Sequence, residues 1–167
     1  MPKCEYYEPK LLEGEREQPG IPVDAMKLLG LLLRAEPMMS KVNRMRYCNR
    51  AIDLILDVLA DFQNAYDFEE DRYHFIVKLN GSVAKFIRIM RIIGETNAIS
   101  IPLEHETMSP NEMKVEMVRH LASLDEGMTK WRMSVIRSRN KGKTSLKGAE
   151  QNQNKKGDST ATKGGYE

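Results

Sequence analysis

The sequence predicts an all-α protein, folded as an up-down-up-down antiparallel bundle of four helices. Four segments repeat apolar residues at steps of three and four, which is the period of a helix with one buried side. No segment shows the alternating pattern of a half-buried strand. The connections between the segments are short, apart from residues 95–108, and short connections favour antiparallel neighbours.

The first two helices are predicted from caps and from apolar spacing. The first is expected to begin at Asp24 as its N-cap and to end or bend at Pro37. Its run "AMKLLGLLL" is apolar around most of the helix, which is more than one bundle can bury. This excess predicts a contact between subunits. The second helix is expected from about residue 42 to residue 66.

The third helix is expected to follow with almost no loop. Asp67 and Glu70 have the spacing of a capping box, so we expect the helix to start there. Gly94 marks its predicted end. Its inward residues should share one stripe at helical spacing, and they are Ile76, Leu79, Val83, Phe86, Met90 and Ile93.

The fourth helix has the clearest start in the chain. In "SPNE", Ser109 is the expected N-cap, Pro110 occupies the first turn and Glu112 completes a capping box. Its apolar residues step by three and four, like the seam of a coiled coil. The residues of this seam are Met113, Met117, Leu121, Leu124, Met128, Trp131 and Val135.

The chain is long enough for one domain with additional terminal segments. It has 167 residues, of which 41% are hydrophobic. We expect a flexible N-terminal extension over residues 1–22, the bundle over residues 23–140, and a disordered basic and polar tail over residues 141–167. The tail is predicted because that segment has almost no aliphatic residues.

The sequence also indicates where in the cell the protein is expected. The first residues are polar and acidic, unlike a secretory signal, and the longest apolar run, "LLGLLL", is too short to span a bilayer. The two cysteines, Cys4 and Cys48, lie far apart without the spacing of a disulfide framework or a zinc site. We therefore expect a cytoplasmic protein that has no membrane partner.

Enzyme motifs are missing from the sequence. It has no glycine-rich phosphate loop, no nucleophile elbow and no HExxH motif. A di-metal bundle would need a Glu-x-x-His on each of two helices. Asp71 and His74 come nearest to that pattern, while Glu116 and His120 are one position too far apart. We expect surface histidines, no metal or other cofactor, and no enzymatic activity.

Charge is segregated along the chain. Residues 34–50 hold five cations and one acid, residues 53–71 hold seven acids and no Lys or Arg, and residues 72–91 hold five cations and no acid. The cations of the third helix should face away from its apolar stripe. Such a face is either solvated or binds an acidic protein or a nucleic acid. The candidate binding residues are Arg44, Arg46, Arg50, Lys78, Lys85, Arg88, Arg91, Arg119, Lys130, Arg137, Arg139, Lys141 and Lys143.

Residues 26–143 resemble a known family in the order of their segments, which are "LLLRAEP", "RAIDLILDVLADFQNAY", "KFIRIMRII", "MSPNE" and "RSRNKGK". The resemblance is to the accessory variability determinant family of diversity-generating retroelements. That family belongs to a superfamily of small helical bundles that includes proteins encoded by intervening sequences in 23S ribosomal RNA genes. Pro37 matches the family's proline between helices one and two, and Arg88 and Arg91 approximately match its helix-three arginines. Met38 stands where the family usually has a basic residue.

The resemblance implies a homopentameric barrel of four-helix bundles. It also implies a non-enzymatic role, in which the protein binds the retroelement's reverse transcriptase and template RNA or other nucleic acid. This binding would support mutagenic reverse transcription and retrohoming of a template repeat into a variable gene. The alternative is a self-assembling bundle of the intervening-sequence type, which has no reverse transcriptase partner.

Overall fold

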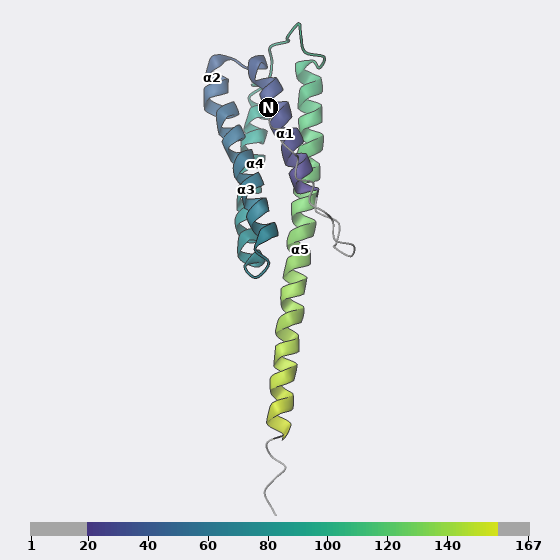
Figure 1. The fold of residues 1–167 in the computed structure, drawn as a ribbon. Coiled ribbons are helices and arrows are strands. Elements are labelled where there is room, and N and C mark those ends of the chain that lie inside the picture. Colours follow the sequence, from purple (N-terminus) through teal and green to yellow (C-terminus); the bar gives the residue numbers. More distant parts are fainter. Residues whose placement is uncertain (1–19, 157–167) are drawn as a thin grey trace, which may run out of the picture.

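The computed structural model describes residues 20–156, with side chains through residue 143. This part of the chain is helical with connecting loops, and no strand occurs in it (Figure 1). The prediction of an all-α protein is therefore confirmed. The elements are α1 (Ile21–Ala35), the 3₁₀ turn η1 (Glu36–Met38), α2 (Lys41–Asn43), the π-helical segment η2 (Arg44–Cys48), α3 (Asn49–Asp67), α4 (Arg72–Glu95) and α5 (Pro110–Lys156).

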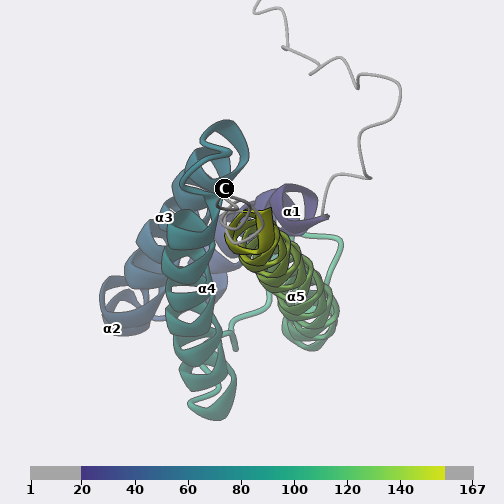
Figure 2. The same ribbon diagram turned by 90° about the horizontal axis from the view of Figure 1, so that it is seen from below.

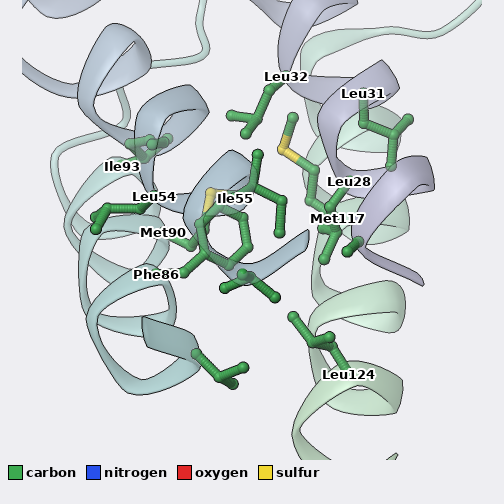
Figure 3. Close-up of a cluster of buried hydrophobic side chains, with 14 of the residues drawn as sticks. Leu28, Leu31, Leu32, Leu54, Ile55, Phe86, Met90, Ile93, Met117 and Leu124 are labelled. Atoms are coloured by element: carbon green, nitrogen blue, oxygen red, sulfur yellow. The ribbon is translucent and has the colours of Figure 1, made fainter. Parts of the chain in front are cut away.

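The long helices pack around one apolar core. Helix α1 contacts α3 and α5, and α4 contacts the same two helices. Figure 2 shows α3 and α4 on one side of the molecule and α1 beside α5. Side chains from all four meet between them, including Leu28 of α1, Ile55 of α3, Phe86 of α4 and Met117 of α5 (Figure 3).

The predicted apolar stripes agree with this core. All six inward residues predicted for the third helix are buried on α4. On α5, Met113, Met117, Leu124 and Met128 are buried. The other three members of the predicted seam are partly buried and pack against the core, namely Leu121, Trp131 and Val135.

Helix α1 begins earlier than expected. Its first residue is Ile21, and Pro22 lies in the first turn, where its missing N–H leaves no hydrogen bond unmade. Asp24 is therefore not the N-cap, and α1 begins two residues before the start expected for the bundle. Asp24 lies inside α1 instead, and its side chain is buried against α5.

The turn between α3 and α4 also differs from the prediction. Asp67 is the last residue of α3, where it accepts a hydrogen bond of 2.9 Å from Gln63. The capping box expected at Asp67 does not form, because α4 begins only at Arg72. The guanidinium of Arg72 donates back to the carbonyl of Ala65 at 3.1 Å. This bond satisfies a carbonyl in the last turn of α3.

The predicted second helix contains an irregularity that its periodicity does not reveal. Helical structure starts at Lys41, capped by Ser40, whose hydroxyl accepts from the backbone N–H of Asn43 at 3.2 Å. It then widens into the π-helical segment η2 before α3 begins. Such segments occur frequently at functional sites.

Helix α5 starts as predicted but ends much later. The Ser109 hydroxyl accepts from the N–H of Glu112 at 3.2 Å, and the Glu112 carboxylate accepts from the N–H of Ser109 at 2.8 Å, so the capping box is confirmed. The helix then runs to Lys156, whereas disorder was expected from residue 141. Extending a helix that the bundle has already nucleated requires no new nucleus. Residues 157–167 of the expected tail and residues 1–19 of the expected N-terminal extension lie outside the described part.

The loop between α4 and α5 is bonded to α1 and to the η1 turn that follows α1. The backbone N–H groups of Ser100 and Ile101 both donate to the carbonyl of Met38, at 3.0 and 2.9 Å. Arg34, near the end of α1, binds the carboxylate of Glu106 with two hydrogen bonds, one of them 3.1 Å long from Nε. The longest connection in the described chain is therefore held against α1 and η1.

Acidification is expected to weaken this attachment. The pKa of Glu106 is lowered from 4.5 to about 2, mainly because the Arg34 guanidinium donates to its carboxylate. A lowered folded-state pKa means that the pair stabilises the protein above pH 4.5 and loses this effect as the pH falls toward about 2. Thermal melts of the wild type and of Arg34→Gln should therefore differ near neutral pH and converge across this range. A difference that stays constant down to pH 2 would contradict the assignment.

Candidate interaction surface

A ridge of cations runs along the outer side of α4. In "KFIRIMRII", Phe86 and Met90 are buried in the core. Lys85, Arg88 and Arg91 are exposed, as the helical period predicts. No hydrogen bond or ion pair joins these three side chains to any other residue in the described chain.

A second group of cations lies close by in the fold. The segment η2, which carries Arg44 and Arg46, packs against α4, and Arg50 follows in the first turn of α3. Arg46 and Arg50 are exposed and Arg44 is half-buried. Within residues 20–143, none of the three side chains forms a hydrogen bond or an ion pair.

We call these six cations, on α4, on the η2 segment that packs against it and in the first turn of α3, the basic patch. Its cations have no bound carboxylate to neutralise them, so their positive potential extends into solvent. Arginine and lysine in such an arrangement can bind phosphates or carboxylates through charge-assisted hydrogen bonds. The basic patch consists of Arg44, Arg46, Arg50, Lys85, Arg88 and Arg91.

Lys78 is separate from the basic patch, although the sequence grouped it with the other α4 cations. Its Nζ lies 3.3 Å from Oδ1 of Asp61, a buried carboxylate on α3. The hydroxyl of Ser82 donates to the other oxygen of Asp61 at 2.6 Å. Lys78 therefore joins α3 to α4 and keeps a buried charge paired.

The candidate cations of α5 fall into two groups. Arg119 and Lys130 each lie 2.6 Å from a carboxylate on the same helix, so both are paired. The guanidinium of Arg139 lies 3.9 Å from the ring centre of Tyr73, on α4. Arg137, Lys141 and Lys143 are exposed and make no such contact within residues 20–143.

The structure reveals a buried polar cluster that the sequence did not predict. Nδ1 of His120 lies 3.2 Å from Oδ1 of Asp24, and the Ser123 hydroxyl donates to Oδ2 of the same aspartate at 2.7 Å. His120 is buried, so the expectation that it lies on the surface is wrong, whereas His74 is exposed. The missed signal was its spacing, because position 120 follows Met117 by three residues and so falls on the inward side of α5.

This cluster has no arrangement suited to catalysis or to metal binding. The Ser123 hydroxyl donates to Asp24 and not to His120, so the serine has no adjacent base that would activate it. In the part of the chain that the structure describes, no group of three or more His, Cys, Asp or Glu side chains could hold a metal ion. The cluster instead fastens α1 to α5.

Cys48 is held as a neutral core residue. Burial raises the pKa of its thiol from 9.0 to about 11, and the charge of Glu36 adds to the effect. Its Sγ lies 3.8 Å from the carbonyl oxygen of Leu32. A buried thiol with a raised pKa is a poor nucleophile.

Helix α1 carries an apolar stripe on its outer side. Val23, Met26 and Leu33 are each more than half exposed. With Gly30 they follow steps of three, four and three, the spacing of a coiled-coil seam. A Cβ placed on Gly30 would meet nothing within 4 Å, so the helix can be approached closely there. The outer stripe agrees with the apolar excess noted in the sequence.

Comparisons with models of protein families, with curated proteins and with solved structures found no match to this chain. Among the helices of residues 20–156, none has both the length and the apolar content needed to cross a membrane.

Proposed function

We propose that this chain is a non-enzymatic accessory protein of a diversity-generating retroelement. In this proposal it binds the reverse transcriptase and its template RNA through the basic patch, and it supports mutagenic reverse transcription and retrohoming. The observation that carries the proposal is the patch itself, since its six cationic side chains have no hydrogen bond or ion pair with described residues. The identity of the partner rests on the resemblance of residues 26–143 to the accessory variability determinant family.

The proposal includes an assembly and a location. The four long helices would run up-down-up-down, and five copies would form a barrel in the cytoplasm. Its support is the exposed apolar stripe of α1, which a single bundle leaves in water. Light scattering of the wild type is expected to give the mass of five chains.

Charge reversal on α4 tests the role of the basic patch. Replacing Lys85, Arg88 and Arg91 together with glutamate should abolish binding of reverse transcriptase and RNA, because like charges would then face an acidic partner. The bundle should remain folded, since these exposed side chains leave no cavity when they are replaced. The readout is pull-down of the reverse transcriptase of a diversity-generating retroelement, with and without nuclease.

The control carries the same change in charge on another surface. R137E/K141E/K143E alters α5 and should retain reverse transcriptase binding. Circular dichroism and light scattering check that both variants keep their helices and their mass. If the α4 variant is folded and still captures the reverse transcriptase fully, the basic patch is only a solvated surface and the proposal fails.

A second candidate function is favoured by the outer stripe of α1. A self-assembling bundle of the intervening-sequence type would use this stripe to form the oligomer and would have no polymerase partner. If this second candidate is correct, the wild-type chain will form a stable oligomer but will capture no reverse transcriptase. The same pull-down and light scattering therefore separate the two candidates.

A further inference from the structure

The C-terminal part of α5 is a basic helix that extends past the bundle. From residue 127 to residue 149 the sequence contains no Asp or Glu and seven cations. Figure 1 shows α5 continuing well beyond the turn that joins α3 to α4. Contact between α5 and the other helices continues at least to Arg139, whose guanidinium lies over the ring of Tyr73. The remaining residues to Lys156 would extend about 25 Å at 1.5 Å per residue.

The helix is accessible from every side where it leaves the bundle. Each residue from 137 to 143 is exposed. Seven consecutive helical residues make about two turns and point in all directions around the axis. A partner can therefore enclose this part of α5, whereas a helix packed on a bundle offers only one face.

The cations on this helix form two rows with the same spacing. One row steps by seven and then four residues, and the second row repeats those steps two positions later. At about 100° per residue, each row stays within about 40°, and the rows lie about 160° apart on the shorter way around the helix. The first row is Lys130, Arg137 and Lys141, and the second is Arg132, Arg139 and Lys143. Lys130 also pairs with Glu126, and Arg139 lies over the ring of Tyr73, so these two would exchange those contacts for phosphate.

We propose that this part of α5 binds in the major groove of double-helical DNA, with its two rows of cations directed at the two phosphate backbones. The major groove of B-form DNA is about 12 Å wide, and an α-helix with its side chains is about 10–12 Å across. A helix in that groove has a phosphate backbone on each flank, which is where the two rows lie. The site goes beyond the proposed function, because it is separate from the basic patch.

The shorter side between the two rows faces away from the bundle, because it lies opposite the seam that contains Trp131 and Val135. Met133 lies on that side and is 42% exposed, so a groove can approach the helix there. The charged contacts are to phosphates, so recognition should depend on them and not on base sequence.

Duplex RNA should bind this helix less well than duplex DNA. The major groove of A-form RNA is deep and narrow, so an α-helix cannot enter it. The same cations could contact only one RNA backbone at a time from outside. Preference for the DNA duplex thus distinguishes binding in the groove from simple attraction between opposite charges.

The test measures binding of the full chain to a fluorescent DNA duplex, an RNA duplex of the same sequence and the DNA single strand. Neutralising one end of both rows in R137Q/K141Q/K143Q should weaken binding to the DNA duplex at least about tenfold. The slope of log K against log salt should fall by about 2.7, which is 0.9 for each of three phosphate contacts. The control K27Q/K41Q, at two exposed cations outside the basic patch and outside α5, should change the affinity for duplex DNA by less than about twofold.

A further variant tests the helix without changing any charge. Gly142→Pro keeps all the cations but interrupts α5, because proline clashes with the carbonyl four residues earlier. It should weaken binding to the DNA duplex and leave binding to the single strand unchanged, with circular dichroism confirming that the bundle is folded. Equal affinity of the wild type for DNA and RNA duplexes would overturn the proposal, as would full duplex binding by either α5 variant. Neither result bears on capture of reverse transcriptase, which depends on α4.

Discussion

Replacing Phe86 with alanine is expected to lower the free energy of unfolding by about 3–5 kcal/mol. Phe86 is completely buried on α4 and lies among side chains of α1, α3 and α5 (Figure 3). Truncation removes the ring from an apolar environment and leaves a cavity that the four helices cannot fully close. Urea denaturation followed by circular dichroism measures the change.

Ile92→Ala is the matched control on the same helix. Ile92 is 39% exposed, so its truncation should cost less than about 1 kcal/mol. Alanine favours the helix in both variants, so helix propensity does not explain a difference between them. Equal losses at the two positions would mean that the core is not organised around Phe86.

Replacing Asp24 with alanine is expected to lower the free energy of unfolding by about 1–3 kcal/mol. The carboxylate accepts from the Ser123 hydroxyl at 2.7 Å and lies 3.2 Å from Nδ1 of the buried His120. Without it, the buried Nδ1 of His120 loses its partner, and a buried unsatisfied group costs about 1–3 kcal/mol, whereas the exposed Ser123 can bind water instead. Thermal and urea unfolding at constant pH provide the measurement.

A double-mutant cycle isolates the contact to α5. In a Ser123→Ala background, the loss caused by Asp24→Ala should shrink, because one of the two partners is already missing. Asp57→Ala serves as the control for removing an exposed aspartate and should change stability by no more than about 0.5 kcal/mol. Additive losses in the cycle would show that the two side chains act independently.

The basic patch was only partly predictable from the sequence. The outward direction of Lys85, Arg88 and Arg91 follows from helical period, because the stripe that contains Phe86 and Met90 must face the core. Helical period does not predict that Lys78 is paired, because its partner Asp61 belongs to another helix. Pairing across helices depends on the register of α3 against α4, which no local pattern specifies.

Local sequence determined the features that depend only on nearby residues. The apolar stripes of α4 and α5 and the capping box of Ser109 and Glu112 arise within one helix or one turn, so spacing and residue type suffice. The tertiary structure alone decided where Asp24 and His120 lie, since 96 residues separate them and only packing of α1 on α5 buries them together. It also decided that α5 extends beyond the bundle, because a helix nucleated by tertiary packing can continue through residues that do not contact the core.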